Sequence, residues 1–391
     1  MSDIMQESLE QHKKHKGKIE VTSKVPLETK KDLSLYYTPG VAQPCKEIHK
    51  TPSSVYDYTS KGHLVAVVSD GSAVLGLGNI GASAAIPVME GKCVLFKKFA
   101  GVDAFPICIE SQDTDTIVNT VKQIAPVFGG INLEDISAPR CFEIENRLKE
   151  QLDIPVFHDD QHGTAIVVAA GLINALKITK KNMQDLKIAI SGAGAAGTAV
   201  TKILTGLGAG DIILCDSLGI ISKDRTDLNP AKKEISELTN KTNLTGTLKD
   251  AIESADVFIG VSAPGIVTEE MIASMNKEAI VFAMSNPIPE IMPDLAKKAG
   301  AKIICTGRSD YPNQINNVLA FPAVFRGALD ACATEINEDM KLAAARALAG
   351  CIPETQLKED YIIPDPLDKS ILGAVSEAVK KAAQDSGAVR R

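Results

Sequence analysis

The sequence contains no tryptophan, few aromatic residues and no closely spaced cysteines. Aromatic side chains make up 4% of the chain, and its eight cysteines include no C-x-x-C pair. Isolated cysteines argue against a zinc ribbon and against a disulfide framework, so they are expected to be reduced, buried thiols. The interior must then be packed mainly with alanine, valine, isoleucine and leucine.

The chain also lacks a basic cluster and a long apolar run. Its formal charge is −7 over 391 residues, with lysines spread along the chain, which gives no electrostatic footprint for nucleic acid or an anionic membrane. The longest apolar run, AIVVAAGL, is too short to cross a bilayer, and the polar N-terminal segment lacks the apolar centre of a signal peptide. We therefore expect a cytoplasmic protein that acts on a small molecule, with no nucleic-acid or membrane partner.

The length and the pattern of apolar segments predict two α/β domains, over residues 1–160 and 161–391. From about residue 186 the strand-like runs KIAIS, DIILCD, ADVFIGVS, EAIVFAMS and AKIICTG alternate with helical stretches, as in a doubly wound, Rossmann-type parallel sheet. The first domain mixes the strand-like runs HLVAVVSD, CVLFKKF and AFPICIE with helices, and helices follow the second sheet. The expected fold class is thus α/β in both domains, with C-terminal helices.

A glycine-rich segment, GAGAAG, follows the run KIAIS and opens an apolar helix. In this context Gly192 permits a tight turn, Gly194 admits a pyrophosphate and Gly197 lets helix and strand approach, while Asp216, at the end of the next strand, accepts hydrogen bonds from ribose hydroxyls. The predicted cofactor contacts in this loop are Gly192, Ala193, Gly194, Ala195, Ala196 and Gly197. A second match, GLGNIG, is not followed by an acidic strand end and is interpreted as a packed turn near the substrate.

Acidic residues follow two strand-like runs. Glu134 and Asp135 lie in INLEDI, and Asp159 and Asp160 lie in PVFHDDQHG. Carboxylates gathered at strand ends could bind a hard ion such as Mg²⁺ or Mn²⁺, although acidic loops are often merely solvated, so spacing leaves both readings open.

Two histidines flank the second acidic pair. His158 and His162 lack the cysteines or the H-E-x-x-H pattern of a zinc site, so they are expected to be structural neighbours. The helix after this segment is expected to begin at Gly163 and Thr164 and to bridge the two domains.

A lysine and a tyrosine are candidates for acid and base chemistry. Lys92 precedes CVLFKKF, read as a strand, and partial burial with like charges nearby would lower its pKa toward neutrality. Tyr36 or Tyr37 precedes a Thr-Pro-Gly turn and could donate a proton. Taken singly, each is more often a surface charge or a packing residue.

Eight segments, taken together and in order, resemble the malic enzyme family, in particular its short prokaryotic-type members. They are YYTPGV, SDGSAVLGLGNIG, GKCVLFKKFAG, INLEDI, FHDDQHGTA, SGAGAAG, MSNP and NNVLAFP. The resemblance implies oxidative decarboxylation of L-malate to pyruvate and CO₂ with reduction of NAD(P)⁺, in a homodimer or larger homo-oligomer that requires Mg²⁺ or Mn²⁺.

The resemblance also implies a role for each matching residue. Lys92 is the general base, Tyr37 the general acid and Asp159 the neighbour that orients Lys92. The implied metal ligands are Glu134, Asp135 and Asp160. Asn286 and Asn317 are the implied contacts to the substrate carboxylate and the nicotinamide ribose.

The chain departs from the family pattern at one substrate contact. Large members carry an arginine where this chain has Ala73, so Ser72 or backbone amides are expected to hold the malate carboxylate instead. Asp216 followed by Ser217 and Leu218 favours NAD⁺, because an acid repels a 2′-phosphate and Leu218 offers no cation, although short members with an acid here include NADP⁺ enzymes.

Two other functions remain as alternatives. A hydroxy-acid dehydrogenase that does not decarboxylate would need no divalent ion. A non-catalytic nucleotide sensor would have no use for an acid, a base and metal ligands together.

Overall fold

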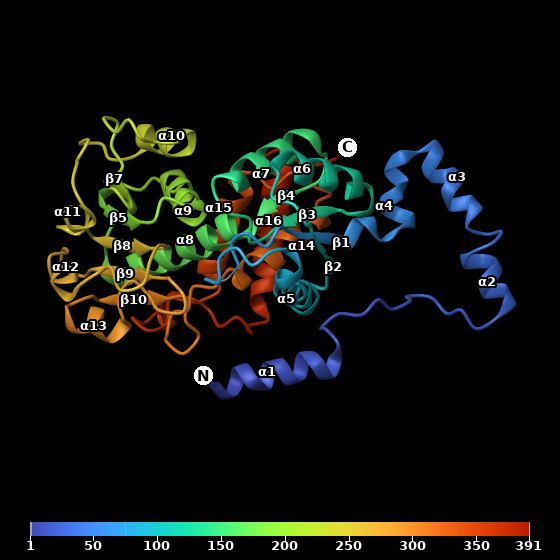
Figure 1. The fold of residues 1–391 in the computed structure, drawn as a ribbon, viewed down its shortest axis with the longest axis horizontal. Helices are drawn as coiled ribbons and strands as arrows, with labels where there is room; N and C mark the ends of the chain where they lie inside the picture. Colours follow the sequence, from blue (N-terminus) through green and yellow to red (C-terminus); the bar gives the residue numbers. More distant parts are fainter. Residues whose placement is uncertain (1, 75, 391) are drawn as a thin grey trace.

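Two sheets and one long helix between them organise the chain. The structure is a computed structural model that describes residues 2–74 and 76–390. Figure 1 shows the second sheet at the left, the first sheet in the middle and an N-terminal arm at the right. The expected α/β class, with a Rossmann-type second half, is confirmed.

The first sheet is parallel, with strand order β2-β1-β3-β4. Its strands are β1 (Leu64–Ser69), β2 (Asp103–Cys108), β3 (Gly130–Leu133) and β4 (Val156–His158). Val65 and Val67 face helix α5 (Ala82–Ala100), whereas Ala66 and Val68 share a core with helices α6 (Thr114–Ile124) and α7 (Arg140–Gln151). Because successive side chains of a strand alternate between faces, both faces of this sheet are covered.

The expectation that CVLFKKF forms a strand is wrong, because these residues lie inside α5. The buried residues Met89, Cys93, Phe96 and Ala100 recur every three or four positions, which is the spacing of one helix face. A short apolar run cannot by itself distinguish a strand from a buried helix turn, and here the longer period decides.

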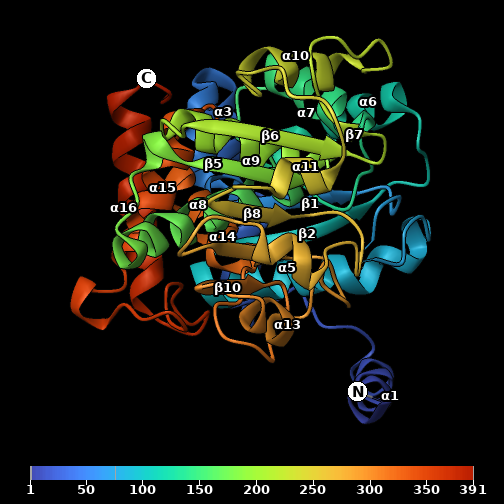
Figure 2. The same ribbon diagram turned by 90° about the vertical axis from the view of Figure 1, so that its left-hand side faces the viewer.

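The second sheet has strand order β10-β9-β8-β5-β6-β7, with only the short β7 antiparallel among the described strands. Its strands are β5 (Lys187–Ser191), β6 (Asp211–Asp216), β7 (Gly219–Ile220), β8 (Val257–Gly260), β9 (Ile280–Ala283) and β10 (Ile303–Thr306). The helices of this half are α9 (Ala195–Gly206), α10 (Pro230–Leu238), α11 (Leu248–Ile252), α12 (Glu269–Ala273) and α13 (Pro293–Lys298). Strand order reverses between β5 and β8, so the crevice expected to receive a ligand opens at their carboxyl ends (Figure 2).

Helix α8 (Asp159–Thr179) joins the two halves and begins directly after β4. Residues Ala165 to Ala170 are all buried, so α8 is a core helix. By length and composition alone α8 could cross a membrane, but 72% of its most apolar 18-residue window is buried inside the protein. That burial accounts for its apolar character without a membrane.

The C-terminal helices pack against both halves. They are α14 (Phe321–Asp330), α15 (Glu338–Gly350) and α16 (Ser370–Asp385). Phe321 and Phe325 of α14 meet Phe96 of α5 edge to face, with ring centroids 4.8 and 5.3 Å apart, and Phe325 also meets Phe157 of β4. Short 3-10 turns occupy Pro52–Ser54, Ser60–His63, Ala125–Val127, Met183–Asp185, Asn317–Leu319 and Glu354–Gln356.

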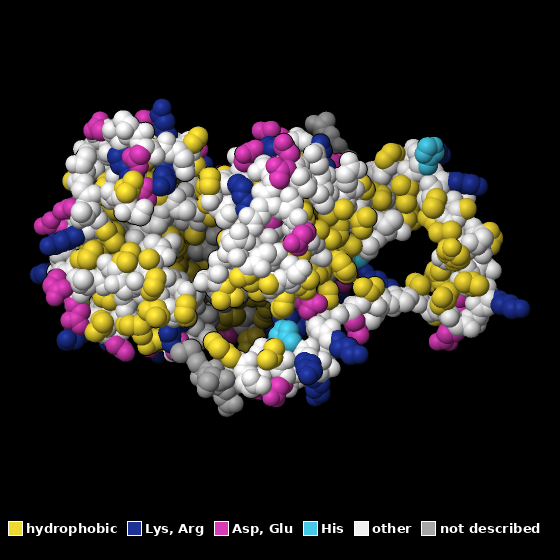
Figure 3. Space-filling view, in the orientation of Figure 1, with side chains coloured by type: hydrophobic (Ala, Val, Ile, Leu, Met, Phe, Trp, Pro, Cys, Tyr) yellow, Lys and Arg dark blue, Asp and Glu magenta, His cyan; other side chains and the backbone are white. Residues whose placement is uncertain are grey.

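The N-terminal arm extends away from this body. It carries α2 (Lys30–Tyr36) and α3 (Ala42–Lys50), and α4 (Val55–Tyr58) returns the chain to β1; α1 (Ser2–His15) precedes the arm and lies below the body in Figure 1. Neither α2 nor α3 contains a buried residue. Apolar side chains gather on the outer part of the arm in Figure 3.

Candidate active site

The carboxyl ends of β3 and β4 bring the two acidic segments together. The strands pair in parallel, with Leu133 opposite His158, so Glu134 follows one strand where Asp159 follows the other. The expectation that α8 begins at Gly163 is wrong, because the helix already includes Asp159 and Asp160 in its first turn. Carboxylates there face the positive end of the helix dipole, which favours their charged form.

Three of these carboxylates form a compact group. Glu134, Asp135 and Asp160 each offer an oxygen, and these oxygens lie within 4.8 Å of one another. Glu134 and Asp135 are buried, and the Asp135 backbone N–H donates to Oδ2 of Asp160 at 2.8 Å. Oxygen donors of this charge and number fit a hard divalent ion, so the residues present suit Mg²⁺ or Mn²⁺.

Lys92 projects from α5 into the same group. Its Nζ lies 2.5 Å from Oδ2 of Asp159 and 3.0 Å from Oε1 of Glu134, and it also lies over the Phe321 ring. Burial alone lowers the pKa of Lys92, but Asp159 and Glu134 outweigh burial, so the pKa is raised above its ordinary value. The expectation that the pKa of Lys92 is lowered was therefore wrong for the protein without a bound ion, because the groups nearest to its ammonium are carboxylates and not other cations.

The close approach of these charged groups also shifts the pKa values of the carboxylates. Burial and the neighbouring carboxylates raise the pKa of Glu134, and burial also raises the pKa of Asp159, while Lys92 opposes both shifts. Oδ1 of Asp159 is buried and, among the described residues, has no hydrogen-bond partner. A site that holds more buried negative charge than its one ammonium can offset is suited to a cation.

Gly163 makes room for Asp159 one helical turn away. A Cβ on Gly163 would lie 1.9 Å from Oδ1 of Asp159 and 3.0 Å from Cβ of Asn317. The structure thus places Asn317, half-buried, beside the start of α8. Asn286 is exposed and follows β9 at a bend, where its carbonyl oxygen approaches Gly76 of the GLGNIG turn.

Ser72 lies close to these acids, but its hydroxyl is already committed. It donates to Oδ1 of Asp70 at 2.6 Å and accepts from the Ser137 backbone N–H at 2.9 Å and from Arg140 at 3.0 Å. A hydroxyl offers one donor and two acceptor positions, so all three are filled within the protein. Arg140, which sequence reasoning missed, also pairs with the buried Asp70 at 2.9 Å.

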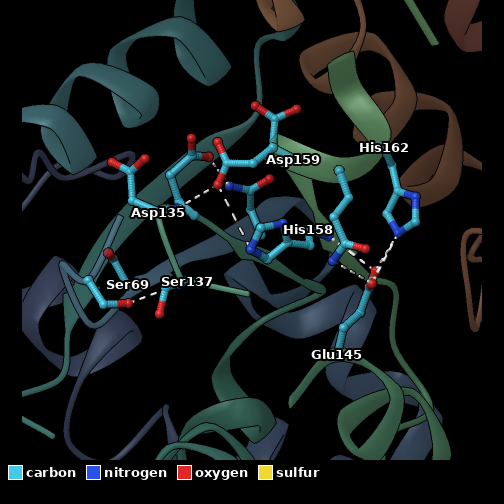
Figure 4. A network of polar contacts seen from close by, with 12 residues as sticks. Ser69, Asp135, Ser137, Glu145, His158, Asp159 and His162 are labelled. Atoms are coloured by element: carbon cyan, nitrogen blue, oxygen red, sulfur yellow. Dashed lines mark hydrogen bonds and ion pairs between the residues drawn. The ribbon is translucent and has the colours of Figure 1, made fainter. Parts of the chain in front are cut away.

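A second polar network lies behind the first turn of α8 (Figure 4). Glu145 of α7 accepts from the His158 backbone N–H and contacts Nε2 of His162 at 2.8 Å, and Lys341 of α15 lies 3.2 Å from Nδ1 of His162. Burial lowers the pKa of His162 to about 4, against the opposing effect of Glu145. His162 therefore connects α7, α8 and α15, and Glu145 and Lys341 are supporting residues that no sequence motif indicated.

Tyr37 is the predicted site residue that the chain does not bring to this group. It caps α2, its surface is 65% exposed, and Figure 1 shows α2 at the far end of the arm, away from α5 and α8.

The glycine loop has the geometry that a dinucleotide needs. Gly192 has φ +108°, and a Cβ there would lie 2.5 Å from the Val261 carbonyl oxygen. A Cβ on Gly197 would lie 1.7 Å from the carbonyl oxygen of Gly192, whereas Gly194 faces open space. The loop residues Gly192 to Gly194 line a cavity of about 760 Å³ together with Asp216, and Ala195, Ala196 and Gly197 form the first turn of α9. The residues present therefore fit a pyrophosphate at the start of α9.

The sequence suggested that Asp216, the aspartate of this cavity, would be free to bind a ribose, but in the structure its carboxylate is already paired. Arg225 and Lys232 both bind the Asp216 carboxylate, at 2.8 and 2.5 Å. The sequence analysis considered only the residues directly after Asp216, where Leu218 offers no cation, and so it did not anticipate Arg225 and Lys232.

Comparison with known proteins agrees with this geometry. The family pattern "Malic enzyme, N-terminal domain" matches residues 16–149, and "Malic enzyme, NAD binding domain" matches residues 161–384. The chain is 58% identical to the bifunctional malic/malolactic enzyme of Bacillus subtilis over 99% of this chain and 95% of that protein. It is 59% identical to the NAD-dependent malic enzyme of Geobacillus stearothermophilus, covering 96% of this chain and 78% of that protein.

Similarity extends to an NADP-dependent protein and to a solved structure. The NADP-dependent malic enzyme of Halomonas elongata is 52% identical over 96% of this chain and 92% of its own. The crystal structure of malic enzyme from Pyrococcus horikoshii superimposes with a TM-score of 0.95 at 49% identity, covering 99% of this chain and 92% of that one.

Proposed function

This chain belongs to the malic enzyme family and carries out the oxidative decarboxylation of malate, and from that premise we propose how its residues divide the work. The observation that carries the proposal is the contact of the Lys92 ammonium with Asp159 and Glu134, beside the group formed by Glu134, Asp135 and Asp160. The proposed base, its orienting acid and the three candidate metal ligands thus lie in one largely buried cluster.

Glu134, Asp135 and Asp160 are the proposed metal ligands. A divalent ion held there would polarise the C1 carboxylate and 2-hydroxyl of malate and would offset the negative charge that raises the pKa of Lys92. With that charge offset, Lys92 could release its own proton to solvent and, as the neutral amine, take the hydroxyl proton while the hydride of C2 goes to NAD(P)⁺; Asp159 keeps the Lys92 side chain in place. Loss of CO₂ leaves C3 to be protonated, which is the task proposed for Tyr37.

The other predicted contacts divide into two groups. Asn286 and Asn317 are proposed to contact the malate carboxylate and the nicotinamide ribose, because they flank the GLGNIG turn and the start of α8. Ser72 is proposed to shape the loop, since its hydroxyl has no capacity left, so backbone amides would take the carboxylate. Residues 1–160 then supply the metal ligands, the base and the acid, and residues 161–391 supply the cofactor site together with Asn286 and Asn317.

Two rival functions make different demands on the same residues. A hydroxy-acid dehydrogenase without decarboxylation has no need of three carboxylates beside its base, and a nucleotide sensor has no need of a buried lysine at an acidic cluster. The purified protein should form pyruvate and reduced nucleotide from malate with Mn²⁺ and neither product in EDTA. Reduced nucleotide formed in EDTA, or reduction that yields oxaloacetate without pyruvate, would contradict the assignment.

We further propose that the enzyme is a cytoplasmic homodimer in which each arm serves the other copy. The arm exposes Leu33, Leu35, Tyr37 and Val41, at 40 to 65% exposure, on helices too short to be stable by themselves. An apolar surface of this kind needs a partner, and a second copy would both cover it and bring its Tyr37 toward the Lys92 of the first. The free state of all eight cysteines supports a reducing compartment.

Mixing two inactive variants tests this arrangement. Tyr37→Phe and Lys92→Ala should each lose malate turnover. When the two variants are unfolded and refolded together, each mixed dimer would contain one site in which both Tyr37 and Lys92 are intact. Random pairing of a two-fold symmetric dimer then restores about a quarter of wild-type activity. Mixing Lys92→Ala with a Lys92→Ala, Tyr37→Phe double variant is the matched control and should restore none. Failure of the first mixture, in a preparation that light scattering shows to be dimeric, would place Tyr37 in its own chain's site.

A further inference from the structure

One carboxylate is fully buried near the carboxyl end of the second sheet without a cation beside it. Glu290 lies between β9 and α13 and has no exposed surface. Among the described residues its side chain forms no ion pair, and it accepts from the Ser262 backbone N–H at 2.8 Å, the Ser262 hydroxyl at 3.3 Å and the Ser285 backbone N–H at 3.0 Å. Burying a carboxylate costs free energy unless such donors offset the loss of water. Glu290 is therefore held by these two serines, and it holds them in turn.

The two serines begin the loops that follow neighbouring strands. The pairing of β8 with β9 closes with a hydrogen bond from the Met284 N–H to the Gly260 carbonyl oxygen at 3.1 Å. Ser262 and Ser285 lie just past that bond, and their N–H groups donate to the two oxygens of Glu290 and not to a neighbouring strand. The carboxylate thus bridges the two loops and satisfies N–H groups that the sheet no longer pairs.

The glycine that ends β8 makes room for this bridge. A Cβ on Gly260 would lie 2.4 Å from Cδ of Glu290 and 2.8 Å from its Oε1, so only a residue without a side chain lets the carboxylate lie against the strand. Ser262 extends the connection to β5, because its hydroxyl lies 2.9 Å from the hydroxyl of Ser191. Glu290 is therefore linked to the ends of β5, β8 and β9, around the crevice where the strand order reverses.

The loops that Glu290 bridges border the cofactor space. Ser262 lines the cavity of about 760 Å³ that also contains the glycine loop. Asn286 directly follows Ser285 and lies between the two halves of the chain. A Cβ on Gly307, just after β10, would lie 2.6 Å from Asn286 Nδ2, and a Cβ on Gly76 of the GLGNIG turn would lie 3.1 Å from the Asn286 carbonyl oxygen. The bond that fixes the Ser285 N–H therefore also fixes where Asn286 begins.

We propose that Glu290 is a positioning residue for hydride transfer, because its carboxylate fixes the Ser285 N–H and thereby holds Asn286 where the nicotinamide and malate meet. Glu290 acts through Asn286 and touches neither ligand, since it has no exposed surface. This inference deepens the proposed function, because it rests on the contacts proposed there for Asn286.

Glu290→Gln is the informative substitution, because it keeps the size of the side chain and turns one acceptor into a donor. The amide oxygen is expected to stay with Ser262, which supplies two donors, so the amide NH₂ faces the Ser285 N–H and repels it. The later part of this loop has its own support, since Arg308 donates to the Pro287 carbonyl oxygen at 3.0 Å. The substitution should therefore displace the start of the loop without unfolding it.

Nucleotide binding in the absence of malate and metal tests the proposal separately from the reaction. The probes are ADP, which lacks the nicotinamide half, and whichever of NADH and NADPH the wild type binds more tightly, followed by its own fluorescence. Glu290→Gln should weaken binding of the dinucleotide about tenfold, as expected for one lost charge-assisted hydrogen bond, and should leave ADP affinity unchanged. Equal losses for ADP and the dinucleotide, or no loss for either, would overturn the proposal. An absence of pyruvate formation by the wild type would contradict the proposed function but leave this comparison standing.

A double-mutant cycle tests whether Glu290 acts through Asn286. Glu290→Gln should lower kcat/KM for malate oxidation about 100-fold in the wild-type background, as expected for a misplaced contact. In an Asn286→Ala background the same substitution should have little further effect, because the residue that it positions is already gone. A 100-fold loss in both backgrounds would show that Glu290 acts independently of Asn286 and would overturn the proposal.

Asp256 provides the matched control at the opposite end of β8. Its carboxylate accepts from the Lys187 backbone N–H at 2.9 Å and from Lys181 at 2.6 Å, so it connects β8 to β5 at their amino ends, away from the crevice. Asp256→Asn should lower Tm and leave both nucleotide affinities and kcat/KM unchanged. If Asp256→Asn lost as much activity as Glu290→Gln, any weakened contact within the sheet would have the same effect, and the positioning role of Glu290 would fail.

Discussion

The acidic cluster predicts that Asp160→Asn makes the metal-free protein more stable than the wild type and the metal-bound protein less stable than the wild type. In Asp160→Asn the oxygen that accepts from the Asp135 backbone N–H is kept, while one negative charge is removed from a group whose oxygens lie within 4.8 Å. At that separation a pair of like charges repels by about 0.9 kcal/mol in water and about 3.5 kcal/mol at a typical protein dielectric. Because a third of the Asp160 side chain is exposed, we take about 1 to 1.5 kcal/mol for each of its two neighbours, Glu134 and Asp135.

Two losses reduce that gain. Asp160 gives up its attraction to the positive end of α8, worth about 0.5 to 1 kcal/mol, and its charge-assisted hydrogen bond becomes a neutral one at a similar cost. The net gain in the metal-free protein is about 1 kcal/mol, or a rise in Tm of about 1 °C for a chain of this size. With Mn²⁺ at 100 times its Kd the wild type gains about 2.7 kcal/mol, roughly 3 °C, and the variant loses most of this gain.

Differential scanning calorimetry at low ionic strength measures the Tm in EDTA and in Mn²⁺. The method needs no tryptophan fluorescence, which this chain lacks. The variant should melt above the wild type in EDTA and below it in Mn²⁺. Asp294→Asn, an exposed acid in the first turn of α13 and outside the cluster, should melt slightly lower in both buffers and keep the full Mn²⁺ shift. If Asp160→Asn melted lower in EDTA, the argument from like-charge repulsion would fail; if it kept the full Mn²⁺ shift, the assignment of Asp160 as a metal ligand would fail.

Two further predictions concern the packing around the site and the buried thiols. Gly163→Ala puts a Cβ 1.9 Å from Asp159, which must displace that carboxylate from Lys92, so kcat/KM should fall about 100-fold, whereas Gly206→Ala, whose Cβ meets only Leu342 at 3.6 Å, should keep its activity. Equal activities in the two glycine variants would refute the packing argument. Burial raises the pKa of three thiols to about 12, so these thiols stay protonated in the folded state while those of the unfolded chain ionise, and stability should fall as pH rises above 9. Urea unfolding should show a loss of roughly 1 kcal/mol per thiol between pH 7.5 and 10. Replacing one of these thiols by alanine should reduce that loss, whereas Cys45→Ala, at an exposed thiol, should not. The three thiols are Cys93, Cys141 and Cys215.

The sequence predicted the α/β class because its strong signals are local. The glycine loop follows β5 at once, and the alternation of buried runs from β5 to β10 reflects a sheet covered on both faces. The reading of CVLFKKF as a strand was wrong because a short, largely apolar run fits either period, and only the buried positions from Met89 to Ala100 reveal the helix. The start of α8 was placed at Gly163 and not at Asp159 because a glycine often marks a boundary, whereas here it clears space for Asp159.

The sequence did not predict those features of the site that depend on contacts between distant segments of the chain. Arg225 and Lys232 reach Asp216 from 9 and 16 residues further along the chain, so reading only the next two residues missed both cations. The pKa of Lys92 depends on Asp159, 67 residues away, which together with Glu134 and Asp160 outweighs the effect of burial. Tyr37 lies on an arm that is far from the acidic cluster in the single chain, and the proposed dimer would supply the missing contact.

The continuity of α8 has a consequence for how the enzyme can be divided. A cut between residues 160 and 161 would pass through the first turn of a helix whose buried residues belong to the same core as Val65 of the first sheet and Ile188 of the second. Each fragment would expose apolar surface that the other covers in the intact chain, and the severed turn would no longer hold Asp159 and Asp160 at fixed positions. The two halves are therefore one folding unit with two tasks, and an exchange of cofactor halves between relatives should preserve the whole of α8 from a single parent.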